Sequence, residues 1–207
     1  MPISKFTETR HGAWAVWEIT EAEQELAFLA LESCPEEIVN PAKRLEFLAV
    51  RALLRLVCDR LQIRYEGTAK DEFGKPHLKH ARHHISLTHS FPFVAVQLDA
   101  HQAVGIDLEQ PRQNLVRVAS RVFNDHERTQ AGEDLTLLCI LWCAKEVLYK
   151  IYGKRGIHFK TQLAINGLQN PDAGTLAGEI LVNPIIRATL HYQTTPQYIL
   201  ATTDTVL

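Results

Sequence analysis

The sequence has no large excess of positive or negative charge. Its 207 residues hold 22 Lys and Arg against 24 Asp and Glu, a formal net charge of −2. Proteins that bind nucleic acid without sequence preference depend on a broad basic surface, which this balance does not supply. A small basic pocket for one phosphorylated ligand is still compatible with it. We expect no nucleic-acid partner.

Long hydrophobic runs are missing as well. The most apolar stretch, residues 135–144, has about half of the roughly 20 residues that a membrane-spanning helix needs. The first residues, MPISKFTETRHG, lack the apolar core of a signal peptide. We therefore expect a cytoplasmic protein with no membrane partner.

Cysteine is infrequent and has no paired spacing. Cys34, Cys58, Cys139 and Cys143 form no CxxC motif, and an apolar share of 46% leaves enough side chains for a core without disulfides. Cys139 and Cys143 stand four apart in a helical pattern, which would also suit a metal pair, but free cysteines are mostly core residues. We predict buried thiols without a chemical role.

Several segments of the sequence have the apolar spacing that is typical of helices. The run from Pro41 to Leu61 has apolar residues every three or four positions and predicts a long helix with Pro at its start. Asn124 and Glu127 have the N-x-x-E spacing of a capping box, and a second long helix is predicted from Asp134 to about Gly153. A shorter helical pattern covers residues 21–33.

Strand patterns surround these helices. They predict strands over residues 13–19, 85–90, 91–99 and 103–109, and an antiparallel meander of short β-type runs after Gly156. Each half of the chain therefore has strands and one long helix. We predict an α+β fold of two similar halves, each a small antiparallel sheet packed with a long helix. Residues 1–102 form the N-terminal half and residues 103–207 the C-terminal half.

Two acids stand close together on a predicted strand. Asp107 and Glu109 are two residues apart, so both carboxylates project from one face while Ile106 and Leu108 point to the other. Adjacent like charges repel, a bound cation relieves the repulsion, and oxygen ligands favour Mg²⁺ over zinc. The alternative is a solvated strand face, where acids are mostly found.

A third acid and a base lie on the second long helix. Trp142, Glu146 and Lys150 follow at four-residue spacing and share one side of the helix. Beside Asp107 and Glu109, Glu146 would complete a three-carboxylate Mg²⁺ site, and Lys150 could pair with a phosphate. The alternative is an ordinary Glu–Lys pair on the helix surface.

A further group of residues could hold a phosphate monoester. Lys75 stands in a Gly–Pro turn, Thr88 and His89 lie at a strand end, and Arg44 and Arg51 belong to the first long helix. Lys and Arg bind phosphate through charge-assisted hydrogen bonds, and Thr adds a hydroxyl donor. An ordinary surface cluster is an equal alternative.

Three sequence blocks occur in one order: GKPHL with ISLTHS, then VGIDLE, then WCAKEVLYK. Together they resemble the 4′-phosphopantetheinyl transferase superfamily, in particular its surfactin-synthetase-activating type. The resemblance implies a monomer with coenzyme A and Mg²⁺ between two similar α+β halves. It also implies a holo-acyl-carrier-protein synthase activity, which moves the phosphopantetheine arm of coenzyme A onto a serine of an apo carrier protein and releases adenosine 3′,5′-bisphosphate.

The resemblance also implies roles for single residues. It suggests three metal ligands, Asp107, Glu109 and Glu146, with Glu146 as the base for the serine. Lys150 resembles the lysine that contacts the pyrophosphate and takes part in catalysis. Glu127 resembles a further acid of the family, and its alternative role as a helix cap is equally compatible with the sequence.

The same resemblance implies residues for the other end of coenzyme A. The 3′-phosphate and adenosine would be held by Arg44, Lys75, Thr88 and His89. Arg51, further along the first long helix, is an additional candidate.

Two other functions stay open from the sequence. A Mg²⁺-dependent phosphodiesterase or nuclease could use clustered acids, although a nuclease needs a wider basic groove. A non-catalytic module that binds coenzyme A or a carrier would not need Glu146 and Lys150 together. For a transferase, the carrier protein should be acidic around its serine, and Lys154 and Arg155 are candidate docking points.

Overall fold

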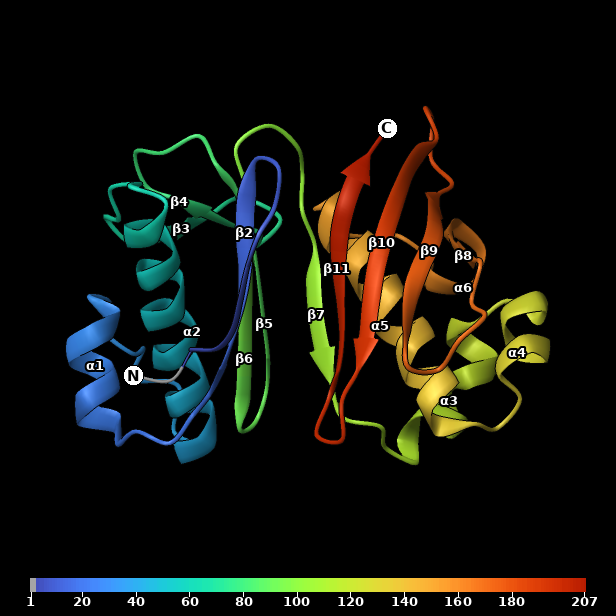
Figure 1. Cartoon of the computed structure of the whole chain (residues 1–207), viewed down its shortest axis with the longest axis horizontal. Helices are drawn as coiled ribbons and strands as arrows, with labels where there is room; N and C mark the ends of the chain where they lie inside the picture. The colour runs from blue at the N-terminus through green and yellow to red at the C-terminus, as the bar shows by residue number, and fades with distance from the viewer. Residues whose placement is uncertain (1–2) are drawn as a thin grey trace. The chain divides into compact units, whose positions relative to one another are not determined.

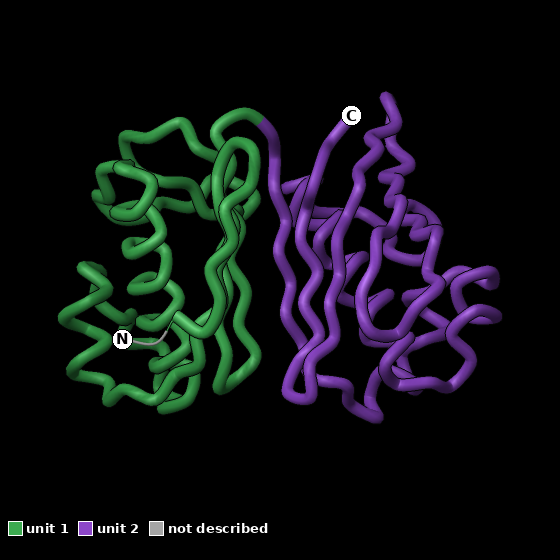
Figure 2. Tube along the Cα trace, in the orientation of Figure 1, with its two compact units in different colours: residues 1–101 green, residues 102–207 purple. Residues whose placement is uncertain are grey.

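The computed structural model describes residues 3–207, and the chain divides into two compact units (Figure 2). The N-terminal unit ends at His101 and the C-terminal unit begins at Gln102. Both units combine helices with antiparallel strands (Figure 1). The predicted α+β class is therefore confirmed.

The N-terminal unit is built on a four-stranded antiparallel sheet. In spatial order, its strands are β1 (Ile3–Glu8), β2 (Gly12–Glu18), β6 (Phe93–Asp99) and β5 (His84–Ser90). Every residue of β6 is buried, as expected for a strand with neighbours on both sides. A separate short pair consists of β3 (Thr68–Lys70) and β4 (Pro76–Leu78).

Two helices belong to this unit, α1 (Glu23–Ala30) and α2 (Pro41–Arg60). Helix α2 packs against β2, β5 and β6 and also contacts α1. It begins where the sequence predicts because the Asn40 side chain accepts a hydrogen bond from the Lys43 N–H and Pro41 occupies the first turn. Its apolar side, including Leu53 and Val57, is fully buried in the core.

The C-terminal unit has a five-stranded antiparallel sheet. The spatial order is β7 (Ile106–Glu109), β11 (Ile199–Val206), β10 (Ile186–Thr194), β9 (Ala173–Ile180) and β8 (Leu163–Asn166). Strands β8 to β11 pair with their sequence neighbours, so the predicted meander is confirmed. Strand β7 joins the sheet by pairing with β11.

The helices of this unit are α3 (Asn114–Val122), α4 (Asp125–Ala131), α5 (Leu135–Tyr152) and α6 (Phe159–Gln162). Helix α5 packs against every strand of the sheet. Asp134 caps the start of α5, because its carboxylate accepts from the N–H groups of Thr136 and Leu137. Gly153, in the left-handed conformation, caps its end.

The four cysteines are free thiols. Cys58, Cys139 and Cys143 are buried as predicted, whereas the prediction is wrong for Cys34, which is only partly buried. Cys34 follows α1 in the loop before α2 and packs against the outside of the core. Within residues 3–207, none of the helices has the length and apolarity to cross a membrane.

Candidate functional site

Strand β7 of the C-terminal unit contains Asp107 and Glu109. Asp107 is opposite Ala201 and Glu109 is opposite Ile199 in the pairing with β11. Ile106 and Leu108 are fully buried, and Asp107 itself is only 5% exposed. A solvated strand face, the alternative explanation for these acids, therefore does not fit Asp107.

The close approach of β7 to α5 depends on Gly105. A Cβ at this position would lie 2.3 Å from the Val147 carbonyl oxygen, far inside contact distance. The Gly105 N–H donates to Thr203 Oγ1 at 2.8 Å, which ties the start of the strand to β11. The glycine in VGIDLE thus allows the strand with the acids to lie directly against the helix with Glu146.

Helix α5 presents its polar side chains toward this strand. Trp142, Glu146 and Lys150 are only partly buried, whereas ten of the 18 residues of the helix are buried. Lys150 Nζ lies 2.8 Å from Asp107 Oδ1 and donates to the Ile106 carbonyl at 2.7 Å. The ion pair of Lys150 thus reaches across to β7, which a simple surface pair along the helix would not do.

The charge of Glu146 is strongly affected by this environment. Burial raises the pKa of Glu146 to about 7, and the negative charge of Asp107 adds to the rise. Lys150 acts in the opposite direction, and Glu109 adds a smaller upward contribution. Glu146 is therefore close enough to Asp107 and Glu109 to be repelled by both carboxylates.

This donor set fits an oxygen-liganded divalent cation. Asp107, Glu109 and Glu146 supply carboxylate oxygens, the ligands that Mg²⁺ prefers, and a cation would relieve their repulsion. Among residues 3–207, no three His, Cys, Asp or Glu side chains already stand in ligating positions. The metal site stays a prediction, supported by the donor chemistry.

Next to Glu146 in the chain, Lys145 forms a buried ion pair that the sequence analysis did not predict. Lys145 and Glu127 have no exposed side-chain surface, and Lys145 Nζ lies 2.8 Å from Glu127 Oε2. Glu127 also accepts from the Asn124 N–H at 2.8 Å and the Ile165 N–H at 3.0 Å. The predicted capping box is confirmed, and the same carboxylate joins α4, α5 and β8.

The N-terminal unit contains a cavity of about 610 Å³ next to α2. Four of its lining residues carry cationic side chains or imidazole, and six are apolar or Pro. The first group is Lys43, Arg51, Lys70 and His89, the second is Pro35, Ile38, Val39, Phe47, Val50 and Leu87, and Glu37 and Asn40 complete the lining. This composition suits an anion attached to an apolar or aromatic group.

Arg51 is firmly held at the wall of this pocket. Its guanidinium carbon lies 3.3 Å from the centroid of the Phe47 ring, and Nη1 donates to the Phe47 carbonyl at 3.1 Å. Nε lies 3.5 Å from Glu32 Oε2. Burial lowers the pKa of Arg51, partly offset by the charge of Glu32, so a bound anion would meet a poorly solvated cation.

Lys43 and His89 share one buried carboxylate. Glu46 Oε2 lies 2.6 Å from Lys43 Nζ and 3.1 Å from His89 Nδ1, and Glu46 Oε1 accepts from the Phe91 N–H at 2.9 Å. Burial alone would raise the pKa of Glu46, but the bonds to His89 and Lys43 outweigh it and lower the pKa to about 2. The Glu46 side chain is therefore ionised at neutral pH and contacts two residues that line the pocket, Lys43 and His89.

The other predicted coenzyme A residues lie elsewhere in this unit. Arg44 donates to Glu23 Oε1 from Nε at 2.8 Å and from Nη2 at 2.7 Å. Thr88 is buried between Leu87 and His89, and because side chains alternate along a strand it faces away from the pocket that these two neighbours line. Lys75 is partly buried, and burial lowers its pKa. Contacts of these three residues with coenzyme A stay predictions.

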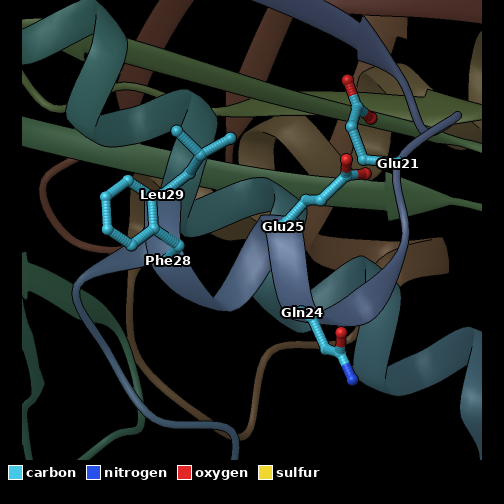
Figure 3. A pocket seen from close by; sticks show the side chains of 5 residues that line it. All are labelled: Glu21, Gln24, Glu25, Phe28 and Leu29. Atoms are coloured by element: carbon cyan, nitrogen blue, oxygen red, sulfur yellow. The ribbon is translucent and has the colours of Figure 1, made fainter.

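A second hollow of the same unit, about 430 Å³, lies along α1 (Figure 3). Figure 3 shows the carboxylates of Glu21 and Glu25 on one side and Phe28 with Leu29 on the other. Glu21 accepts from Trp17 Nε1 and Glu25 from the Ala22 N–H, so both acids stabilise the local fold. The described lining contains no cation and does not suit a phosphorylated ligand.

The residues from Ala103 to Thr203 include β7 and α5 with all three acids and Lys150. This segment matches the family model of the 4′-phosphopantetheinyl transferase superfamily. The match supports phosphopantetheinyl transferase activity in general, and this superfamily acts on carrier proteins with coenzyme A. The match does not extend to the pocket of the N-terminal unit. Comparison with curated proteins gives no match.

Proposed function

We propose that the chain is a phosphopantetheinyl transferase of the surfactin-synthetase-activating type. It would move the 4′-phosphopantetheine arm of coenzyme A onto a serine of an apo acyl or peptidyl carrier protein. The observation that carries this proposal is the cluster of Asp107, Glu146 and Lys150 within the segment that matches the superfamily. We further propose that the protein acts as a cytoplasmic monomer.

The reaction needs a base, a stabilised leaving group and an oriented phosphate. The serine Oγ would attack the β-phosphorus of coenzyme A, its proton would pass to Glu146, and the bond to the departing adenosine 3′,5′-bisphosphate would break. Lys150, held by Asp107 and the Ile106 carbonyl, is the cation for the pyrophosphate.

Mg²⁺ is the proposed cofactor. Asp107, Glu109 and Glu146 would hold it, and when bound it would neutralise charge on the pyrophosphate. The repulsion of Glu146 by Asp107 and Glu109 supports this assignment, because a divalent cation would remove it.

The pocket of the N-terminal unit suits the nucleotide end of coenzyme A. Arg51, Lys43, Lys70 and His89 offer donors to a 3′-phosphate, and the apolar lining offers a surface for the adenine. Arg44, Lys75 and Thr88 stay candidates for the same end of the substrate from the family resemblance.

Mass spectrometry of an intact carrier protein tests the proposal. An apo carrier is incubated with the full chain, coenzyme A and Mg²⁺, beside one sample with EDTA and one with a carrier whose serine is replaced by alanine. A gain of one phosphopantetheine group, absent from both controls, is expected. If carriers of the fatty-acid, polyketide and peptide types all stay unmodified, the proposed transfer is wrong.

A further inference from the structure

Glu46 lies behind the basic pocket of the N-terminal unit and is not one of the residues that line it. Its side chain is 2% exposed. It contacts two pocket residues from different elements, Lys43 in the first turn of α2 and His89 near the end of β5. One buried carboxylate therefore holds two separate donors of the same pocket.

The two donors need such an anchor. Lys43 is 56% exposed and His89 is 46% exposed, so solvent alone would leave both side chains with several rotamers. Glu46 also accepts from the Phe91 N–H, which fixes the carboxylate relative to the turn after β5. The three hydrogen bonds tie the two donors to the backbone of the unit.

We propose that Glu46 is a positioning residue that holds Lys43 and His89 in place for a phosphate monoester bound in this pocket. The inference rests on the proposed function, because it takes the 3′-phosphate of coenzyme A as that ligand. An imidazolium donates from both ring nitrogens, so His89 can keep its Nδ1–H on Glu46 and offer Nε2–H to the phosphate.

The role of Glu46 can be distinguished from a simple effect of charge. Glu46→Gln removes a negative charge close to a bound anion, so the loss of Coulomb repulsion alone predicts tighter binding. If Glu46 acts by holding Lys43 and His89, the same substitution weakens binding, because the neutral amide holds both cations less firmly. The two explanations therefore predict opposite signs.

Glu36 offers a matched control. It is exposed in the loop before α2 and is not one of the residues that line the pocket. Glu36→Gln makes the same chemical change as Glu46→Gln. We expect this variant to bind a phosphorylated ligand with a Kd within about twofold of that of the original protein.

Calorimetric titration of the full chain tests the inference. The ligands are adenosine 3′,5′-bisphosphate, coenzyme A and dephospho-coenzyme A, which lacks the 3′-phosphate. Glu46→Gln should raise the Kd of the first two about tenfold, comparable to the loss of a charge-assisted hydrogen bond, and leave the third within about twofold. Equal or tighter binding of the 3′-phosphate ligands, or an equal loss for all three, would overturn the role of Glu46.

A double-mutant cycle separates positioning from general damage to the fold. In a His89→Gln background, Glu46→Gln should cost clearly less affinity than in the original protein, because one of its two targets is gone. An undiminished loss would overturn the inference. If Glu46→Gln does not fold, Glu46→Asp is used, which keeps the charge and shortens the reach.

The ligand set also distinguishes this inference from the proposed function. An original protein that binds none of the three ligands contradicts the proposed function and, with it, the ligand assigned to Glu46. Binding by the original protein together with an unaffected Glu46→Gln variant contradicts the role of Glu46 alone.

Discussion

Lys145 and Glu127 form an ion pair from which solvent is completely excluded, with Nζ 2.8 Å from Oε2. Lys145 also donates to the carbonyl oxygens of Val122 at 3.0 Å and Phe159 at 2.8 Å. All three ammonium protons thus have acceptors on different segments. Lys145 immediately precedes Glu146, so the pair holds the part of α5 that bears the candidate base.

Breaking this pair should destabilise the protein strongly. Lys145→Met leaves Glu127 buried without its cation, a change that typically costs about 3–5 kcal/mol. We expect a loss of this size in the free energy of unfolding, measured by urea denaturation. Lys154→Met, at an exposed position, is the control and should change stability by less than about 0.5 kcal/mol. A loss for Lys145→Met no larger than that of the control would contradict the prediction.

Glu146→Gln should abolish phosphopantetheine transfer. The amide cannot take up the serine proton, and it weakens the proposed metal site, whereas the basic pocket of the N-terminal unit is untouched. We expect no modified carrier by mass spectrometry and partly retained affinity for coenzyme A by calorimetry. Glu133→Gln, an exposed substitution before α5, is the matched control. Normal turnover by Glu146→Gln would remove this residue from the catalytic role.

Gly105→Ala should disturb the contact between β7 and α5. The added Cβ would meet the Val147 carbonyl oxygen at 2.3 Å, and the neighbouring Val147 backbone cannot rotate away as a side chain can. We expect a loss of stability of about 2 kcal/mol or more together with reduced transfer. Gly156→Ala, where an added Cβ would meet nothing within 4 Å, should cost only the penalty of its positive φ, about 1 kcal/mol. Equal thermal stability of the two variants would show that the close approach is not limiting.

Charge reversal after α5 should affect the carrier protein and not coenzyme A. Lys154 and Arg155 are exposed in the turn between Gly153 and Gly156, as expected for residues that dock a partner. The double variant Lys154→Glu/Arg155→Glu should raise the carrier KM, since an acidic carrier would meet repulsion. The affinity for coenzyme A should be unchanged. Carrier kinetics indistinguishable from those of the original protein would exclude this turn from docking.

Acid should selectively remove the stabilisation that Glu46 provides. Its folded pKa, about 2, is below the ordinary value of 4.5, so the ionised form stabilises the fold above pH 4.5, and this contribution declines as the pH falls toward 2. The difference in unfolding free energy between the original protein and Glu46→Gln should therefore shrink between pH 5 and pH 3, measured by denaturant unfolding. A difference that stays constant over this range would show that ionisation of Glu46 does not stabilise the fold.

Long periodic segments could be predicted from the sequence because local chemistry decides them. Helix α2 starts at its Asn–Pro cap, and α5 ends at Gly153, as the sequence indicates. Strand β1 and helix α3 were not predicted. Strand β1 has only partial burial and depends on pairing with β2, while α3 is short and its apolar residues are only partly buried against the core.

The candidate site was predictable where spacing along one element decides it. The common side of Trp142, Glu146 and Lys150 follows from helical periodicity. Glu46 and Lys43 could not be identified in this way, because their importance comes from His89, which lies on a distant strand. A Glu three residues after a Lys on a helix looks like an ordinary surface pair until the tertiary contact is known.

The pairing of β7 with β11 has a consequence for synthesis. Gly105 and Thr203 are bonded across 98 positions of the chain, so the strand with Asp107 has no sheet to join until β11 has emerged from the ribosome. The N-terminal unit, in contrast, has all its strands once residue 99 is made. During synthesis, all the strands of the unit with the basic pocket are therefore complete before the strand with Asp107 has a sheet to join.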